Sequence, residues 1–311
     1  MDEQLYRRAE QRLWDEVGAA PVEHRVHLNR NDVGVRVLEL GEGPPAVFLH
    51  GGPGASGAIW ASLAARLPHI RCLLVDRPGT GLSAAQLLAD SAAARRQSES
   101  MLVDVLDAFG IDRAHVVASS HGSHVAILSS ALHPGRVERS VHLGCPGFVE
   151  GMRLTTVDRL VLLPGAASLF SRMPVSERGL RQTFRQLGHG ELLERDGLSP
   201  ATVDWMLALQ RHTDTMRNEF AAMQAMGTFR RGFDPELTIT AETLSSVVSP
   251  SLFLWGEHDV YGGAEVARSV VDAMPTAELE LLPGAGHLCW FDEIDRVAGA
   301  VDRHLLAHSD A

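Results

Sequence analysis

Residues 115–128 constrain the fold of this chain more than any other stretch, because a strand must turn sharply into a helix there. The run His-Val-Val-Ala is apolar and β-branched, which predicts a buried strand, and the apolar residues after the turn predict a helix. A serine at the apex of such a turn adopts a strained conformation with its hydroxyl exposed, and the positions two before and two after it must be small. Ala118 and Gly122 meet this requirement around Ser120, whereas Ser119 has a valine and a histidine at those positions. Ser120 is therefore the candidate nucleophile.

Short apolar runs alternate with helical patterns along most of the chain. Besides the strand before Ser120, buried strands are predicted at residues 46–49, 72–76, 140–143, 252–255 and 278–282. Helices are predicted at residues 58–67, 98–109, 264–274 and 293–306. A surface helix at 3–17 and an edge hairpin of strands at 22–28 and 33–38 come first. This alternation is typical of an α/β fold with a mostly parallel central sheet flanked by helices, in which the loops at the carboxyl ends of the strands carry the chemistry.

Two glycine-rich segments follow the first two of these buried strands. The sequence His-Gly-Gly-Pro-Gly at residues 50–54 suits neither a strand nor a helix, so its backbone amides can come close to a ligand. The sequence Asp-Arg-Pro-Gly-Thr-Gly-Leu-Ser at residues 76–83 forms the second segment, and we expect it to give structural support.

Together these motifs resemble the α/β-hydrolase family. The turn at Ser120 is similar to the family's nucleophile elbow, small-x-Ser-x-Gly, with alanine where glycine is commoner. The two glycine-rich segments resemble the family's His-Gly-Gly-Pro-Gly loop and its Asp-Arg-x-Gly-x-Gly-x-Ser turn. The resemblance covers nearly the whole chain outside one insertion. It implies an α/β-hydrolase core at residues 1–146 and 236–311, with an inserted helical cap, or lid, at 147–235.

The resemblance also implies a catalytic triad in the chain order serine, aspartate, histidine. Asp259 ends a Gly-Glu-His-Asp turn after one late strand and His287 follows the next strand, so both can meet Ser120 at the carboxyl edge of the sheet. His287 would accept the proton of the attacking hydroxyl, while Asp259 would hold the imidazole in the correct tautomer. His258 is a rival base on composition alone. We discount it, because a neighbour of the acid on one turn cannot easily act in series with that acid.

Charge that develops on the substrate oxygen would be met by the backbone N–H groups of Gly52 and His121, the oxyanion hole that the resemblance implies. Three histidines, His50, His121 and His124, lie close to this machinery and suggest a metal site. A metallohydrolase would also place carboxylates there, and these are missing. We therefore expect no metal.

The helix-rich insertion carries an apolar stripe. Met216, Phe220 and Met223 recur at helical spacing, and Trp205 precedes them. Such a stripe more often forms packing core. A lid must nevertheless cover the serine, and here the side chains available for this are apolar. We therefore expect Trp205, Phe220 and Met223 to contribute to the substrate site.

Composition excludes several classes of function. The formal net charge of -11 repels nucleic acid phosphates and anionic lipid, so we expect neither a nucleic acid nor a membrane as partner. All 28 basic residues are arginine, which removes Schiff-base and P-loop chemistry, and we expect no cofactor. An N-terminus without an apolar signal core, the lack of a long apolar stretch, and three cysteines without metal-like spacing predict a cytoplasmic protein. The arginines at 230–231 could receive an anionic substrate group, although a solvated surface is the commoner use.

We therefore expect a serine hydrolase that cleaves an ester, thioester or related acyl bond of a small hydrophobic substrate through an acyl-enzyme. A serine at the elbow argues against haloalkane and epoxide chemistry, for which the family uses aspartate. A prolyl aminopeptidase-like peptidase shares the glycine-rich loop, but its elbow is typically Gly-Gly-Ser-Trp-Gly, from which this sequence departs. Carbon–carbon bond hydrolases of ring-cleavage products and hydroxynitrile lyases use the same triad and stay open. A ligand receptor or a non-hydrolytic cyclase on the same fold is the alternative from another class.

Overall fold

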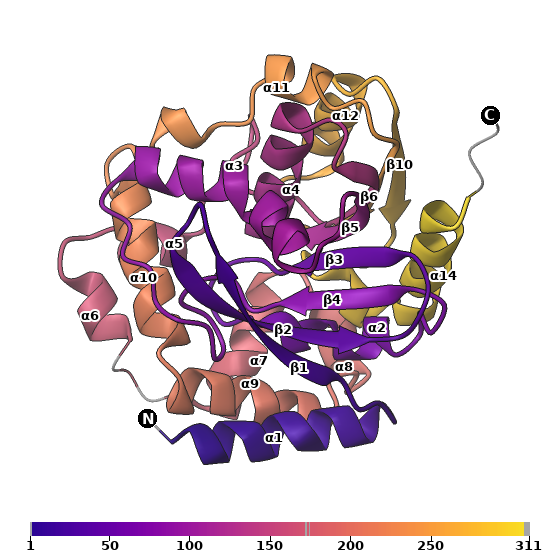
Figure 1. Cartoon of the computed structure of the whole chain (residues 1–311). Coiled ribbons are helices and arrows are strands. Elements are labelled where there is room, and N and C mark those ends of the chain that lie inside the picture. Colours follow the sequence, from indigo (N-terminus) through magenta and orange to yellow (C-terminus); the bar gives the residue numbers. More distant parts are fainter. Residues whose placement is uncertain (1, 172, 174, 308–311) are drawn as a thin grey trace.

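The centre of the molecule is an eight-stranded sheet, seen in a computed structural model that describes residues 2–171, 173 and 175–307 (Figure 1). Its strand order is β1-β2-β4-β3-β5-β6-β9-β10. Only β2 runs antiparallel to its neighbours, so the expected mostly parallel sheet and edge hairpin are confirmed. The strands are β1 (Val22–Leu28), β2 (Val33–Leu40), β3 (Pro45–Leu49), β4 (Arg71–Val75), β5 (Ala114–Ser119), β6 (Val137–Leu143), β9 (Ser251–Gly256) and β10 (Ala277–Leu282).

Helices cover both faces of the sheet, which is why its central strands are apolar at successive positions. Along β3, Ala46 and Phe48 belong to one buried cluster and Val47 and Leu49 to another. The helices packed on the first face include α2 (Ala61–Ala64) and α14 (Ile294–Leu305). Those on the second face include α3 (Ser91–Ala108), α4 (His121–Leu132) and α12 (Ala264–Asp272).

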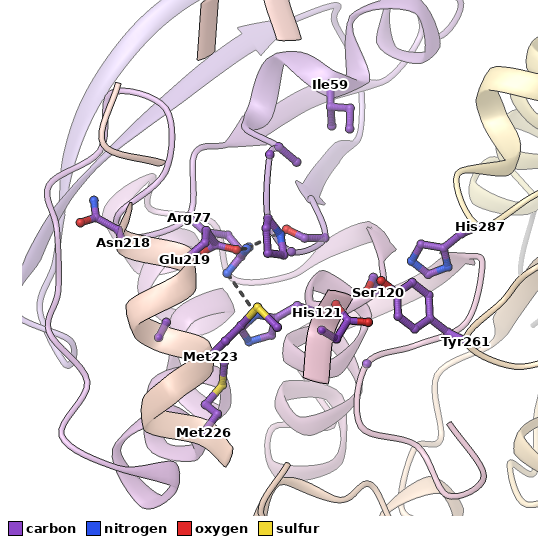
Figure 2. A pocket seen from close by; sticks show the side chains of 18 of the residues that line it. Ile59, Arg77, Ser120, His121, Asn218, Glu219, Met223, Met226, Tyr261 and His287 are labelled. Atoms are coloured by element: carbon purple, nitrogen blue, oxygen red, sulfur yellow. Dashed lines mark hydrogen bonds and ion pairs between the residues drawn. The ribbon is translucent and has the colours of Figure 1, made fainter. Parts of the chain in front are cut away.

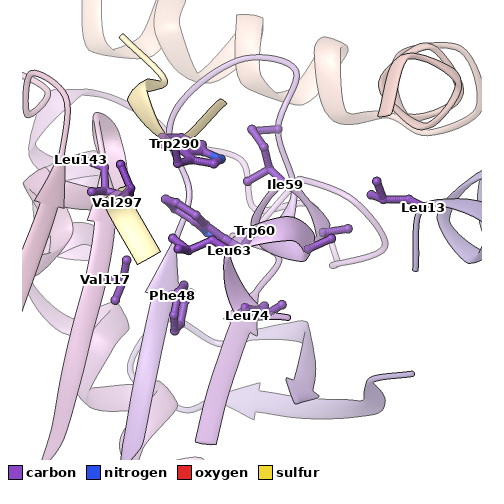
Figure 3. Close-up of a cluster of buried hydrophobic side chains, with 14 of the residues drawn as sticks. Leu13, Phe48, Ile59, Trp60, Leu63, Leu74, Val117, Leu143, Trp290 and Val297 are labelled. Carbon is purple, nitrogen blue, oxygen red and sulfur yellow. The ribbon is translucent and has the colours of Figure 1, made fainter. Parts of the chain in front are cut away.

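An aromatic cluster anchors the end of the chain to the first face of the sheet. Figure 3 shows Trp60 and Trp290 packed against each other, and their ring centroids are 4.5 Å apart. Phe48 of β3 meets Trp60 edge-on at 5.8 Å. All three side chains are buried, and burying one large aromatic side chain stabilises a fold by about 2–3 kcal/mol. Because Trp290 follows His287 closely in sequence, this packing also fixes the loop that carries the histidine.

A helical segment, defined here as α5 to α10, fills the interval between β6 and β9. Figure 1 shows these helices gathered on one side of the sheet, with the N-terminal helix α1 (Glu3–Glu16) lying along α9. The helices are α5 (Thr156–Val161), α6 (Ala166–Phe170), α7 (Glu177–Gln186), α8 (Gly190–Glu194), α9 (Pro200–His212) and α10 (Thr215–Met226). A two-residue hairpin, β7 (Gly227–Thr228) and β8 (Gly232–Phe233), follows them. Over the described residues, no helix is both long enough and apolar enough to cross a bilayer.

Two helices differ from the expected bounds. Helix α3 begins at Ser91 rather than near residue 98, because the Asp90 carboxylate accepts a 2.8 Å hydrogen bond from Ala93 N and caps the helix there. Its first turns are rich in alanine and arginine and carry no apolar periodicity. The helix expected at 58–67 is a 3₁₀ turn, η1 (Gly57–Trp60), followed by the short α2. The remaining short elements are η2 (Pro235–Leu237), α11 (Ala241–Ser245) and α13 (Cys289–Asp292).

Candidate functional site

The sharp turn expected at Ser120 joins β5 to α4. Ser120 has φ 51° and ψ -118°, a backbone conformation that residues other than glycine rarely adopt. The turn also brings Gly122 against the end of β3, where a Cβ would lie 2.0 Å from the carbonyl oxygen of Leu49. Glycine is therefore required two residues after the serine by close packing against the neighbouring strand. Such strain at a half-buried serine is typical of functional turns.

The expected acid and base lie together at the carboxyl edge of the sheet. His287 Nδ1 is 2.8 Å from Asp259 Oδ2, and both residues are buried. The same oxygen accepts a hydrogen bond from Cys145 N at 2.8 Å, and Oδ1 accepts one from Tyr261 N at 3.0 Å. These contacts fix the carboxylate so that it can accept a hydrogen bond from His287 Nδ1, and in that tautomer of the neutral imidazole Nε2 is the proton acceptor.

Figure 2 shows His287 beside Ser120, with the ring of Tyr261 against them. The Tyr261 and His287 ring centroids are 4.6 Å apart. Ser120 and His287 line one cavity, and no hydrogen bond joins them in the described structure, a common state of such pairs before a substrate binds. The rival His258 has an exposed side chain, while its backbone N–H is held by Ala285 O at 2.9 Å. The arrangement therefore favours His287 as the group that can take a proton from Ser120.

The amides expected to form an oxyanion hole belong to Gly52 and His121, and both residues line the cavity with Ser120. Neither backbone N–H donates a hydrogen bond to any part of the chain that the structure describes. Gly51 sits directly against the serine, where a Cβ would lie 3.0 Å from Ser120 Cβ. The glycine-rich loop thus allows the backbone to approach the serine, and two unpaired N–H groups can receive an oxyanion there.

Arg77, expected only to support a turn, lies inside the cavity wall. Its guanidinium donates to the backbone oxygens of His50 and Gly51, at 3.1 and 2.7 Å. It also contacts His121 Nδ1 at 3.2 Å and forms a 2.9 Å ion pair with Glu219 of α10. Figure 2 shows both contacts as dashed lines. Glu219 could not be identified from the sequence, because nothing local marks a lone glutamate on a helix as the partner of a residue so distant in sequence.

The histidines near the site are held in the neutral form by burial. Burial, reinforced by the charge of Arg77, keeps the pKa values of His50 and His121 well below the usual range. Burial lowers the pKa of His124 to about 3, and its Nε2 lies 3.0 Å from Leu237 O. No cluster of three or more metal-ligating side chains occurs among the described residues. The three histidines instead connect neighbouring loops through hydrogen bonds.

These buried neutral histidines predict that the protein loses stability in mild acid. Burial lowers the pKa of His142, like that of His124, to about 3, whereas an unfolded histidine titrates near 6.5. Between these two values the unfolded chain binds more protons than the folded one. The free energy of unfolding should therefore fall as the pH drops below about 6.5, by up to about 1.4 kcal/mol per pH unit for each histidine. Urea unfolding at a series of pH values from 7.5 to 5.5 measures this slope.

The variant His124→Gln provides the control for this prediction. Glutamine can still donate a hydrogen bond to Leu237 O but does not titrate. The dependence of the unfolding free energy on pH should become shallower by the contribution of one histidine. Equal slopes for the variant and the unchanged protein would show that protonation of His124 has no part in the loss.

A cavity of about 190 Å³ opens above Ser120 and His287. Of the three substrate-site residues expected in the insertion, Met223 lines it, while Trp205 and Phe220 do not. Trp205 is only 1% exposed and its Nε1 lies 3.5 Å from the hydroxyl of Tyr6. Helix α1 covers this face of α9, which local sequence cannot reveal. Phe220 of α10 instead belongs to the apolar cluster that includes Phe148, Val161 and Leu237.

This placement predicts opposite effects for two truncations. Met223→Ala should reduce kcat/KM for long acyl esters relative to an acetyl ester, because part of the cavity wall is lost. The loss corresponds to about 1–2 kcal/mol of transition-state stabilisation. Trp205→Ala should leave the chain-length preference unchanged but lower the free energy of unfolding by about 3–5 kcal/mol. A series of p-nitrophenyl esters and a denaturant titration separate the two effects. A changed preference in the Trp205 variant would show that this side chain reaches the substrate.

A second histidine–carboxylate pair supports the loop of His287. His189, between α7 and α8, has its Nδ1 2.7 Å from Asp292 Oδ2, and its Nε2 accepts a hydrogen bond from Leu288 N at 3.1 Å. The same Asp292 oxygen accepts a hydrogen bond from Gly286 N at 3.0 Å. The amides on both sides of His287 are thus fixed by one buried pair. No motif in the sequence marked either member.

Known proteins resemble this chain over most of its length. A model described as the alpha/beta hydrolase family matches residues 46–300. A 2-hydroxy-6-oxononadienedioate/2-hydroxy-6-oxononatrienedioate hydrolase from Cupriavidus pinatubonensis is 27% identical over 274 residues, which cover 85% of each chain. A 2-hydroxy-6-oxo-6-phenylhexa-2,4-dienoate hydrolase from Burkholderia cepacia is 24% identical over 288 residues, which cover 87% of each.

Solved structures share the fold at lower identity. The carboxylesterase CesB from Bacillus subtilis superposes with a TM-score of 0.75 at 19% identity, over 99% of each chain. The 2-hydroxy-6-oxo-6-phenylhexa-2,4-dienoate hydrolase from Rhodococcus sp. strain RHA1 gives a TM-score of 0.72 at 18% identity, over 93% of this chain and 99% of the other. At these identities the likeness shows a common architecture.

Proposed function

Because the chain belongs to the alpha/beta hydrolase family, we propose that it is a serine hydrolase in which Ser120 attacks a carbonyl carbon of a small molecule. One observation carries this proposal: His287, whose Nδ1 is 2.8 Å from Asp259 Oδ2, lies beside the strained serine, so that its Nε2 is the atom that can accept the proton. A serine hydroxyl is almost wholly protonated at neutral pH, so it needs such a base to become a nucleophile.

The proposed reaction proceeds in two halves. Ser120 Oγ bonds to the carbonyl carbon as its proton moves to His287 Nε2, and the Gly52 and His121 amides hold the developing oxyanion. The bond to the leaving group then breaks, and the leaving group takes the proton from His287. Water next attacks the acyl-enzyme with His287 again as base, which releases the acid and restores the serine. Asp259 stabilises the imidazolium in both halves.

We propose a carbon–carbon bond next to a ketone as the first candidate for the bond that is broken. The curated relatives described above are named for hydroxy-oxo acids, molecules with a ketone and carboxylates but no ester, so their hydrolysis must break such a bond. In this chain Ser120 would attack the ketone of a tautomer in which a second carbonyl is conjugated with the departing carbon. As the carbon–carbon bond breaks, its electron pair passes to that second carbonyl, and the leaving group takes the proton from His287 and departs as an enol.

An ester is the second candidate, and the cavity itself favours it. Apolar side chains such as Met223, Met226 and Phe184 supply much of the wall, and the one guanidinium there is already paired with Glu219. An uncharged ester fits such a surface. The side chains of α7 and α10 form this wall, so we propose that residues 147–235 act as a lid over a core formed by residues 1–146 and 236–311.

Turnover of two substrates tests the proposal. We expect the purified protein to release nitrophenol from p-nitrophenyl butyrate in many cycles. Cleavage of 2-hydroxy-6-oxo-6-phenylhexa-2,4-dienoate, followed by its absorbance, measures its activity on the carbon–carbon bond. The larger kcat/KM identifies the preferred bond. Release of no more than one slow equivalent from either compound would instead indicate a ligand receptor on a hydrolase fold.

A further inference from the structure

Arg77 is the only arginine among the described residues that line the cavity, and the chain has no lysine. Its side chain is 4% exposed, so it is a buried cation beside the reacting groups. A buried guanidinium next to a substrate cavity can be the receptor for a carboxylate, because the two match in charge and shape. The surroundings of Arg77 decide whether it can act in this way.

The N–H groups of Arg77 are nearly all occupied. Nε donates to His50 O, and NH2 donates both to Gly51 O and to Glu219 Oε2. NH1 lies 3.2 Å from His121 Nδ1. A guanidinium has five N–H groups, and these contacts leave one of them open, so a substrate carboxylate cannot bind in the two-pronged manner unless Glu219 leaves.

Glu219 cannot move into solvent without loss. Its side chain is 8% exposed, it comes from α10 of the proposed lid, and its carboxylate lies 2.9 Å from Arg77 NH2. Figure 2 shows the pair on the wall of the cavity that faces His121. Separating a buried ion pair leaves an uncompensated charge, which is strongly unfavourable. The pair is therefore a fixed part of the wall.

A second carboxylate, Asp158 of α5, also lines the cavity. Its Oδ2 accepts hydrogen bonds from Thr155 N and Thr155 Oγ1, at 2.9 and 2.7 Å, which fixes it at the start of its helix. With Arg77 neutralised by Glu219, the wall carries one net negative charge. Arg230 and Arg231 are exposed and lie outside the cavity lining, so they offer no compensation there. A substrate carboxylate inside would meet like charge and no open cation.

We propose that Glu219 is a specificity-determining residue that neutralises Arg77 and selects substrates without a carboxylate at this end of the cavity. The inference rests on the proposed serine hydrolase function and names its substrate class. It also separates this chain from the relatives described above, whose named substrates are carboxylic acids. A ketone or ester with an uncharged, apolar group would enter the cavity without displacing Glu219.

Two matched esters test this inference. p-Nitrophenyl hexanoate and mono-p-nitrophenyl adipate have the same acyl chain length, but the second replaces the terminal methyl group by a carboxylate. We expect the unchanged protein to prefer the hexanoate, by at least about tenfold in kcat/KM. Glu219→Gln keeps an oxygen that can accept from Arg77 but removes the negative charge, so the preference should shrink by at least about tenfold.

Two further variants serve as controls. Glu219→Asp keeps the charge and should keep the preference for the hexanoate. Glu177→Gln removes an equal charge from an exposed site on α7, where Glu177 pairs with Arg181, and should leave the ratio of the two esters unchanged. Thermal melting of each variant reports on folding, and Glu219→Ala, which also removes the charge, replaces the glutamine variant if that variant unfolds.

The outcomes distinguish this inference from the proposed function. Three results would overturn the role of Glu219 but not the proposed serine hydrolase function. They are equal kcat/KM values for both esters, a preference for the adipate in the unchanged protein, and an unchanged ratio of the two esters in Glu219→Gln. An equal shift in Glu177→Gln would show a general field effect and would also overturn it. Failure to turn over either ester, with Ser120 unreactive toward a fluorophosphonate, would overturn both proposals together.

Discussion

Replacing Ser120 by alanine should lower kcat by roughly three to six orders of magnitude while the protein stays folded. The hydroxyl is the only group in the proposed mechanism that bonds to the substrate, and neither His287 nor the oxyanion amides can replace it. Alanine keeps the Cβ that lies near Gly51, and it breaks no hydrogen bond because Ser120 Oγ makes none among the described residues. Steady-state kinetics with a p-nitrophenyl ester measure the loss, and a thermal melt checks the fold.

A fluorophosphonate gives a second measurement of the same prediction. It reacts only with a serine that is activated by a base and an oxyanion hole, so the adduct should map to Ser120. Ser119→Ala is the matched control, since Ser119 is fully buried at the end of β5 and its hydroxyl has no partner in the described structure. That variant should keep kcat within about tenfold of the unchanged protein and label normally. An adduct on any other serine would contradict the assignment of the nucleophile.

The groups that could be predicted from the sequence are those whose positions depend on local geometry and strand order. The turn at Ser120 follows from small neighbours at fixed offsets, and the structure adds the cause, since Gly122 packs against the end of β3. Asp259 and His287 follow the ends of neighbouring parallel strands, so chain order alone brings them to one edge of the sheet.

Contacts between the core and the helical segment could not be predicted in the same way. Arg77 and Glu219, or His189 and Asp292, meet because two segments far apart in sequence pack on each other, and single polar residues carry no periodic pattern that reports this packing. Trp205 shows the converse error. Its apolar stripe indicated a buried face, but only the tertiary structure shows that α1, rather than the substrate, covers that face.

The substitution Asp259→Asn should lower kcat by a factor on the order of 10⁴, with a small effect on KM. The carboxylate now accepts hydrogen bonds at both oxygens, from His287 and Cys145 N at Oδ2 and from Tyr261 N at Oδ1. An asparagine has only one accepting oxygen, so its NH2 group must face one of these donors. If the NH2 group faces His287, the imidazole takes the tautomer with a proton on Nε2 and cannot accept one from Ser120.

The other orientation of the asparagine also costs activity. If its oxygen faces His287, the correct tautomer survives, but the NH2 group opposes Tyr261 N and no negative charge stabilises the imidazolium. The rate of fluorophosphonate labelling should therefore fall together with kcat, which locates the loss in the activation of Ser120 rather than in substrate binding. Glu257→Gln, an exposed acid two residues away, is the control and should change kcat little. A loss below about tenfold in Asp259→Asn would mean that another carboxylate orients His287, because removal of the partner charge would then have cost less than about 1.4 kcal/mol in the transition state.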